Sequence, residues 1–128
     1  YPYNGTIAPP MTSFYGLYAR HAEFGGHHPF DVAPVWLERK DRVDMTKPMD
    51  LVSTNDIIGG NSGSPLVNAN LEVVGLVFDG NIEMLPNRYV YRGEIPRSVS
   101  VHVDGIMEAL KKVYDAERLV QELLGTGK

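Results

Sequence analysis

The sequence has no cysteine, no long hydrophobic run and no excess of basic charge. Without cysteine, a disulfide scaffold, a thiol nucleophile and a thiolate metal site are excluded. The 16 acidic and 12 basic side chains give a net charge of −4, and the Lys and Arg residues are scattered, so the basic patch of a nucleic-acid-binding protein or a membrane anchor is missing. The longest apolar run is too short to cross a bilayer, and we expect no membrane span.

The chain also lacks the usual start of a translation product, because it opens with Tyr1 and carries neither an initiator Met nor a signal peptide. We therefore expect a fragment or a processed chain. Its 128 residues, with 13 Gly, 9 Pro and 43% hydrophobic residues, are typical of one loop-rich globular domain rather than a disordered chain.

Proline and glycine divide the sequence into parts that differ in composition and in hydrophobic periodicity. Residues 1–50 are predicted to form an irregular lead-in whose regular pieces are residues 13–20 and a helical turn around residues 35–40. Residues 51–103 are predicted to form a small antiparallel sheet or barrel, because short apolar runs alternate there with Asn, Gly and Pro. The predicted strands are residues 51–53, 65–68, 71–78, 88–91 and 98–103. In the last strand Val99, Val101 and Val103 alternate with Ser100 and His102, which predicts a half-buried strand.

Residues 104–128 change to a helical period, so the predicted fold is mainly β with a C-terminal amphipathic helix. Asp104 is a good N-cap, and Gly125 supplies a stop. Glu108 and the other charged residues fall away from an apolar stripe, which we expect to pack on the barrel rather than on a partner. The stripe consists of Ile106, Leu110, Val113, Val120 and Leu123. Because Asp115 could cap a second helix, one helix and two helices both remain open.

The segment that carries chemistry is a glycine-rich turn around a serine, with the sequence Gly59-Gly60-Asn61-Ser62-Gly63-Ser64-Pro65. Nucleophilic attack on a carbonyl needs an exposed hydroxyl and two backbone N–H donors that converge on the developing oxyanion. Glycines let the backbone turn tightly enough to aim those donors. We therefore predict Ser62 as the nucleophile and the amides of Gly60 and Ser62 as the oxyanion hole.

Two other interpretations of this segment are a plain loop and a glycine-rich anion cradle. A phosphate-binding loop runs into a helix and carries a Lys after its last Gly, whereas this segment runs into Pro65 and an apolar strand. The surrounding sequence argues against a plain loop, because it resembles the nucleophile segment of chymotrypsin-like serine proteases, whose usual form is G-D-S-G-G-P. Asn61 replaces the acidic residue of that form, so the resemblance implies no activation by an ion pair with a new N-terminus.

The strands after Ser62 are predicted to form a hairpin that turns about Ala69. This register places Leu76 opposite Ser62, and Asp79 then lies on the order of 10 Å from the nucleophile at about 3.3 Å per residue. That is the reach of a dipeptide from its scissile carbonyl to its amino terminus, so Asp79 is suited to pair with a substrate ammonium. Geometry alone favours the alternative, in which Asp79 opens a turn with Gly80 and Asn81.

A wider stretch of sequence resembles the bacterial dipeptidyl peptidase 7 and 11 family of serine exopeptidases. The two specific motifs are S-T-N-D-I-I-G-G-N-S-G-S-P at residues 53–65 and G-L-V-F-D-G-N at residues 75–81. The similarity covers nearly the whole chain, through residues 16–21, 29–31, 36–37, 97–103 and 113–119.

The resemblance implies the C-terminal half of a chymotrypsin-like double barrel and a serine dipeptidyl aminopeptidase acting on peptides. In that family the Asp matching Asp79 binds the α-ammonium of the substrate, and an Arg after it goes with acidic side chains before the cut. Gly80 stands here, which looks like the dipeptidyl peptidase 7 type and implies an open pocket for apolar side chains, with Phe78 as a further substrate-binding residue. The resemblance also implies a homodimer of the full-length protein, a periplasmic or cell-surface setting in a Gram-negative bacterium, and no cofactor or metal.

A serine hydroxyl needs a base, and the base needs an orienting carboxylate. The chain has four histidines, His21, His27, His28 and His102, and the resemblance places the catalytic His of the family upstream of all of them. We therefore expect this chain alone to be inactive. His102 is expected to be a surface or satisfied residue, and the adjacent His27 and His28 a loop pair, because neighbouring side chains rarely converge on one metal ion.

Asp56 leaves open a second substrate specificity, for basic side chains before the cut. It precedes Ser62 by six residues, the spacing at which trypsin-like enzymes place the carboxylate that receives Lys or Arg, although residues 54–56 could simply cap a turn. There are two alternative functions. One is a glutamyl- or trypsin-like endopeptidase, which shares the G-N-S-G motif, and the other is a protease-like module that binds peptides without cutting them.

The five Met residues show no helical pattern and are expected to fill space.

Overall fold

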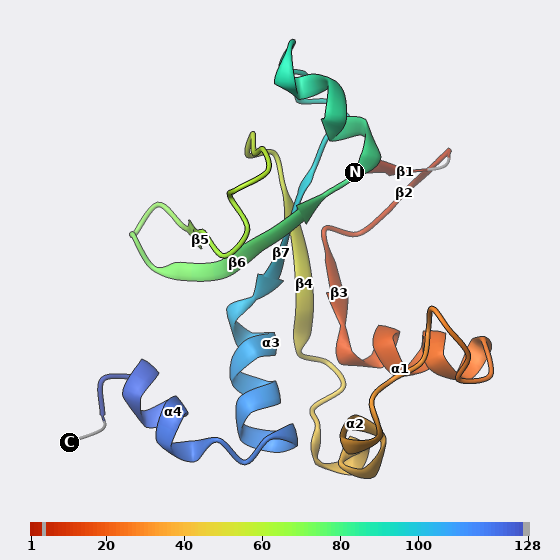
Figure 1. The fold of residues 1–128 in the computed structure, drawn as a ribbon, viewed down its shortest axis with the longest axis vertical. Coiled ribbons are helices and arrows are strands. Elements are labelled where there is room, and N and C mark those ends of the chain that lie inside the picture. Colours follow the sequence, from red (N-terminus) through yellow and green to blue (C-terminus); the bar gives the residue numbers. More distant parts are fainter. Residues whose placement is uncertain (4, 127–128) are drawn as a thin grey trace. The chain divides into compact units, whose positions relative to one another are not determined.

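The computed structural model describes residues 1–3 and 5–126, which form two compact units (Figure 1). The sheet unit consists of Tyr1–Thr12 and Met49–Val103, and the helical unit consists of Ser13–Pro48 and the chain from Asp104 onward. The expected lead-in of residues 1–50 is therefore divided between both units. Residues 127–128, the end of the predicted C-terminal helix, lie outside the described residues.

The sheet unit contains a five-stranded sheet in which β7 lies between β4 and β6 (Figure 1). In order across the sheet, the strands are β3 (Met11–Ser13), β4 (Pro48–Ser53), β7 (Ser98–His102), β6 (Val73–Gly80) and β5 (Pro65–Val67). β7 is antiparallel to both of its neighbours, and β5 is antiparallel to β6. A separate antiparallel ribbon joins β1 (Pro2–Tyr3) to β2 (Thr6–Ile7). Four of the five strands predicted within residues 51–103 are thus confirmed.

The predicted strand at residues 88–91 is wrong. A 3₁₀ helix, η2 (Ile82–Arg88), follows β6 there, and the chain beyond it forms a turn. Pro86 provides the carbonyl that accepts from the amides of Tyr89 and Val90. The side chain of Asn87 then bonds both the amide and the carbonyl of Arg92. These local bonds replace the strand pairing that the apolar residues 89–91 suggested, because Asn side chains compete with secondary structure for backbone partners.

The alternation predicted for β7 is present, and its serine face is the buried one. Ser98 and Ser100 have no exposed surface, whereas Val99 and Val101 are half-buried. The hydroxyls of Ser98 and Ser53 are 2.7 Å apart, which satisfies Ser98 on the neighbouring strand. The neighbour on the other side, β6, presents Gly75, where a Cβ would lie 2.8 Å from the carbonyl oxygen of Val101. Small residues therefore allow the three central strands to approach closely.

The helical unit contains two helices and a 3₁₀ turn from its first segment: α1 (Phe14–Glu23), α2 (Pro34–Glu38) and η1 (Lys40–Arg42). Ser13 caps α1 by accepting from the amide of Gly16. The core gathers Phe14, Val43 and Val113, and the Trp36 ring stacks on Phe14 with centroids 5.8 Å apart. The helical pieces predicted near residues 13–20 and 35–40 are confirmed.

The C-terminal segment forms two helices separated by a break. They are α3 (Val103–Glu108), which continues into a π-helical turn, η3 (Ala109–Val113), and α4 (Glu117–Leu123). α3 begins one residue before Asp104, so the predicted N-cap lies in the first turn. Gly125 follows α4 with φ +67°, as a C-terminal stop requires.

One prediction for this segment is wrong, and of the two open possibilities the structure has two helices, without the Asp115 cap. Glu108 was expected to face away from the core, but it is buried, and its carboxylate accepts from the amide of Asp44 at 2.8 Å. Asp115 does not cap α4, whose N-cap is Ala116. Asp115 instead forms ion pairs with Arg39 and Arg42. Within the described part of the chain, no helix combines the length and hydrophobicity that a bilayer crossing demands.

Candidate active site

The hairpin β5–β6 decides where the candidate site forms, and its predicted register is wrong. Leu76 pairs with Pro65 rather than standing opposite Ser62. The turn spans residues 68–72 instead of centring on Ala69, because the Asn68 carboxamide oxygen accepts from the amides of Asn70 and Glu72. β6 is therefore displaced by three residues relative to the prediction, and this displacement brings its end closer to Ser62.

Asn61 fastens the turn that presents Ser62. Its side-chain oxygen accepts from the Ile58 amide at 2.8 Å, and its own amide donates to the Ile58 carbonyl at 3.1 Å. On the other side, the Asn61 carbonyl accepts from Ser64. The residue that departs from the usual acidic form of the motif thus has a local role in holding the loop, which its position in the sequence did not reveal.

The amides of the loop alternate between engaged and free donors. Those of Asn61 and Gly63 donate to Ile58 and Val77, whereas those of Gly60 and Ser62 have no acceptor among the described residues. Gly60 has φ +103° and Gly63 φ +88°, a backbone region that glycine enters readily. An oxyanion hole requires free donors that converge on one oxygen atom, and the amides of Gly60 and Ser62 are the pair predicted for that role.

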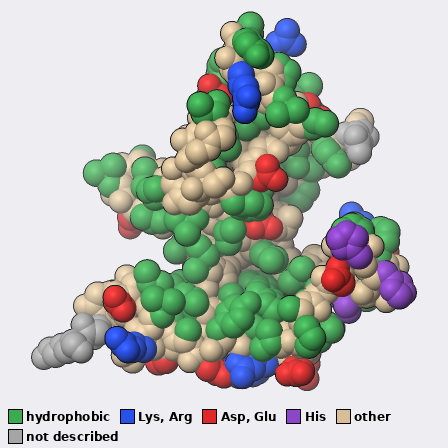
Figure 2. Space-filling view, in the orientation of Figure 1, with side chains coloured by type: hydrophobic (Ala, Val, Ile, Leu, Met, Phe, Trp, Pro, Cys, Tyr) green, Lys and Arg blue, Asp and Glu red, His purple; other side chains and the backbone are tan. Residues whose placement is uncertain are grey.

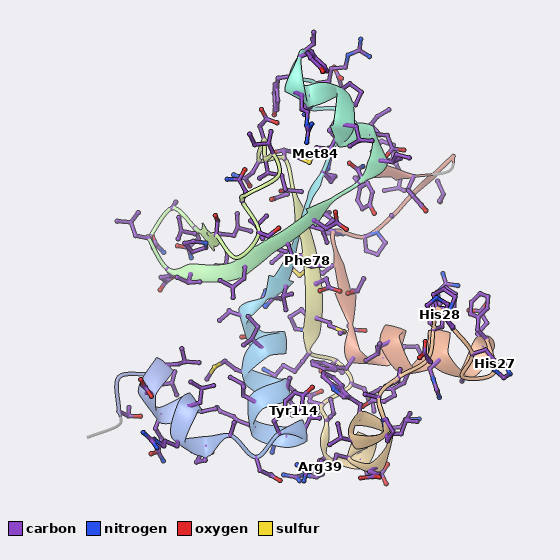
Figure 3. The ribbon with its side chains drawn as sticks, viewed as in Figure 1. His27, His28, Arg39, Phe78, Met84 and Tyr114 are labelled. Carbon is purple, nitrogen blue, oxygen red and sulfur yellow. The ribbon has the colours of Figure 1, made fainter. Side chains whose placement is uncertain are left out.

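A β-bulge at Phe78 aims the end of β6 toward Ser62. Val77 pairs with Ser100 and Asp79 with Val99, so Phe78 is the extra residue with no partner on β7. The Ser62 hydroxyl donates to the Phe78 carbonyl at 3.4 Å, which places the serine beside the bulge. In Figure 3 the Phe78 label marks this point on β6.

One cavity of about 180 Å³ brings the predicted residues together. Ser62, Phe78, Asp79 and Gly80 line it, whereas the predicted site residue Gly60 does not, although its neighbour Gly59 does. The remaining lining residues are Ile57, Ile58, Asn81, Met84, Leu85 and Arg88. Met84, Leu85 and Arg88 were missed as site residues, because their segment was predicted as a space-filling Met followed by a strand. Asp56 is exposed and does not line the cavity.

Asp79 lies within β6 and pairs with Val99, so it does not open a turn with Gly80 and Asn81 as the alternative predicted. Its Oδ1 accepts from the amide of the next residue, Gly80, at 2.8 Å. The side chain is exposed and lines the cavity. Its second oxygen has no hydrogen-bond partner among the described residues, so the carboxylate is held in place and still has an acceptor to offer.

The space beside Gly80 is occupied by Met84. A Cβ built on Gly80 would lie 2.6 Å from the Met84 sulfur, and Met84 is 7% exposed. The pocket next to Gly80 is therefore closed on one side by a flexible thioether rather than fully open. Figure 3 shows Met84 on the segment that follows β6. The sequence predicted Met84 only as a space-filling residue, because the helical turn that carries it was not foreseen.

No histidine lines the cavity, and His102 is the one histidine of the sheet unit. His102 pairs with Gly75 on the ladder between β6 and β7. His27 and His28 lie on the loop after α1 (Figure 3), and both are exposed. Figure 2 shows histidine side chains, in purple, at the surface. His28 is 3.5 Å from Asp31, and no group of three potential metal ligands occurs among the described residues.

The comparisons with known proteins agree on one family. The chain matches the peptidase S46 family over residues 1–125. It is 29% identical over 106 residues to a dipeptidyl-peptidase 7 of Capnocytophaga gingivalis, which covers 77% of this chain and 15% of that protein. It is 38% identical over 76 residues to an Asp/Glu-specific dipeptidyl-peptidase of Shewanella putrefaciens, which covers 59% of this chain and 10% of that protein.

A solved structure shares the fold. The crystal structure of Porphyromonas endodontalis DPP11 superposes with a TM-score of 0.80 at 23% identity, over 95% of this chain and 19% of that one. This match agrees with the expected part of a chymotrypsin-like double barrel. The chain spans only a small share of the length of each relative. With a family match over nearly its whole length, the chain belongs to the peptidase S46 family.

Proposed function

We propose that this chain supplies the nucleophile, the oxyanion hole and the substrate pocket of a serine dipeptidyl aminopeptidase, which removes dipeptides from free peptide N-termini. The observation that carries the proposal is the single cavity that gathers Ser62 and Asp79 next to two free loop amides. A nucleophile, an oxyanion site and an ammonium-binding carboxylate are the three features that this reaction needs.

In the proposed reaction the Ser62 hydroxyl attacks the carbonyl carbon of the second substrate residue, and a base takes the hydroxyl proton. The amides of Gly60 and Ser62 stabilise the negative charge on the carbonyl oxygen. The C–N bond then breaks, the base returns its proton to the leaving amine, and water hydrolyses the acyl-enzyme by the same steps in reverse. The base and its carboxylate are expected from outside this chain, so the chain alone should not turn over.

Asp79 sets the length of the product in this proposal. The Phe78 carbonyl oxygen lies 3.4 Å from the Ser62 hydroxyl, and Asp79 is the next residue along β6. Two extended substrate residues span about 7 Å at roughly 3.3 Å each, and a hydrogen bond of about 3 Å from the ammonium to the carboxylate brings the reach to about 10 Å. A carboxylate one residue beyond Phe78 is therefore within reach of the ammonium of a dipeptide whose carbonyl lies at Ser62, whereas a longer acyl part would place its ammonium beyond Asp79.

The side chain before the cut is proposed to be apolar. Gly80 adds neither charge nor bulk, and most of the other lining side chains are apolar. Asp56 lies outside this lining, which disfavours a pocket for Lys or Arg. By resemblance to the bacterial dipeptidyl peptidase family, we also propose a periplasmic or cell-surface location in a Gram-negative bacterium and a homodimer of the full-length protein.

The test compares free and N-acylated fluorogenic dipeptides on the full-length protein. Cleavage of free-amino substrates alone is expected, and Asp79→Ala should abolish it because the ammonium loses its partner. Asp56→Ala is the matched control, since it removes an exposed carboxylate outside the cavity. Efficient cleavage of the acylated substrates would instead indicate an endopeptidase.

A second measurement separates a protease from a module that only binds peptides. A fluorophosphonate probe should label Ser62 in the full-length protein, and Ser62→Ala should remove the label. The isolated chain should stay unlabelled. Labelling of the isolated chain would show that one of its own four histidines serves as the base.

A further inference from the structure

The cavity that contains Ser62 is lined by two charged side chains, Asp79 and Arg88. The carboxylate has a role in the proposed reaction, whereas the guanidinium has none so far. Arg88 is the last residue of η2, the 3₁₀ helix that follows β6. Its position in the same cavity as the nucleophile raises the question of which group it contacts in a bound substrate.

The geometry of η2 directs Arg88 toward the cavity. On a 3₁₀ helix, side chains three residues apart are eclipsed, so Leu85 and Arg88 share one face while Met84 and Asn87 are buried. The guanidinium reaches the oxyanion loop, because its Nη2 lies 4.0 Å from the position that a Cβ on Gly59 would take. Gly59 and Ser62 line the same cavity, so the cation borders the space that a bound substrate would enter.

The guanidinium has no ion-pair or hydrogen-bond partner among the described residues. By contrast, Arg39 and Arg42 both pair with Asp115, and Arg97 donates to the carbonyls of Gly93 and Pro96. A guanidinium offers five donors in a planar fork that matches a carboxylate, and no residue described around this cavity uses them. The side chain is therefore free to bind an anion that enters the cavity.

We propose that Arg88 binds the carboxylate of an Asp or Glu side chain at the position before the cut, so that the pocket accepts acidic as well as apolar side chains. This inference rests on the proposed function. The methylene stem of Glu would pack on Leu85 and the other apolar lining residues, and its carboxylate would meet the guanidinium. Gly80 carries no cation, so the charge that selects an acidic side chain comes from η2 instead of β6.

The test measures kcat/KM of the full-length protein on three free-amino dipeptidyl coumarylamides that end in Glu, Gln or Leu. Glu and Gln have the same shape and differ in charge, and the coumarylamide excludes any effect of a C-terminal carboxylate. Arg88→Gln is expected to lower kcat/KM for Glu by about 10- to 100-fold, the range for losing a charge-assisted hydrogen bond. The values for Gln and Leu should change by less than about 3-fold. Arg88→Lys should retain part of the preference, because it keeps the charge and loses the fork.

Arg92→Gln is the matched control, because Arg92 lies four residues further along and lines a different cavity. It should leave the ratio of Glu to Gln turnover unchanged. An unchanged ratio in Arg88→Gln, or an equal loss for all three substrates, would overturn the inference.

A binding measurement keeps the inference separate from the proposed reaction. In a Ser62→Ala background, a free-amino dipeptide amide ending in Glu should bind more tightly than its Gln counterpart, and Arg88→Gln should remove the difference. If the unsubstituted protein cleaves no dipeptide but this charge preference is found, the proposed function fails and the role of Arg88 stands. If binding shows no preference for Glu, the role of Arg88 fails whatever the turnover.

Discussion

The contact between Gly80 and Met84 gives the sharpest prediction about the pocket. In Gly80→Ala the new Cβ would lie 2.6 Å from the Met84 sulfur, roughly 1 Å short of the ~3.5–4.0 Å at which non-bonded atoms pack well. Gly80 has no positive φ, so the substitution adds no backbone strain of the left-handed region. The whole cost should therefore come from this one contact.

The magnitude follows from how Met84 can respond. Inserting a methyl group into a packed site costs about 1–3 kcal/mol, and a thioether near the end of a flexible side chain can relieve part of it by changing rotamer. We expect Gly80→Ala to lower the free energy of unfolding by about 1 kcal/mol. Met84→Ala should cost about 2 kcal/mol, the low end for a buried Met, because the site borders a cavity. The double variant should cost about 1 kcal/mol less than the sum of the two single variants, because the clash is gone.

Urea unfolding followed by circular dichroism, on the four proteins of this cycle, provides the measurement. Strict additivity of the two substitutions would refute the reasoning, because it would mean that Gly80 and Met84 do not touch. Gly63→Ala is a useful contrast, since its Cβ would meet nothing within 4 Å and its φ of +88° leaves only backbone strain. That variant should show no coupling to Met84→Ala.

Three further predictions concern the loop, the core and the acid stability. Gly60→Ala forces a side chain onto φ +103°, so in the full-length protein kcat should fall about 100-fold with little change in KM, measured in steady-state assays. Phe14→Ala should cost about 3–5 kcal/mol in urea unfolding, because Phe14 is fully buried against Trp36. Hydrogen bonds and charge from Arg42 and Arg39 hold the pKa of Asp115 below its usual value, so its stabilising effect is present at neutral pH and is lost as the pH falls through the lowered pKa. Asp115→Asn should therefore be less stable at pH 7 and lose less stability below pH about 4, measured by thermal unfolding across pH.

The sequence anticipated most of the elements but not how they combine. Short apolar runs predicted four strands correctly, because alternation and turn residues are local signals. The strand predicted at residues 88–91 failed because Pro86 and Asn87 supply local hydrogen bonds that pattern alone does not weigh. For the same reason the sequence did not predict η2 or the three cavity-lining residues that it carries, Met84, Leu85 and Arg88.

The register of the β5–β6 hairpin is a second feature that the sequence did not predict correctly. An Asn-rich turn was recognised, but its length depends on the bonds that Asn68 makes to residues 70 and 72. A shift of three residues decides whether Leu76 or the bulged Phe78 lies beside Ser62. Register errors of this kind are expected wherever turn geometry, rather than the hydrophobic pattern, fixes the pairing.

The sequence by itself determined the family resemblance and predicted Ser62 as the nucleophile, because a serine between glycines needs only residue types and spacing to be recognised, whereas the role predicted for Asp79 came from that resemblance. The tertiary structure alone decided the pocket. It leaves the amides of Gly60 and Ser62 free, places Met84 over Gly80, and brings Arg88 into the same cavity as the nucleophile. The physical reason is that a pocket is made by side chains from segments distant in sequence, and their approach depends on register, bulges and helix phase, which no local pattern encodes.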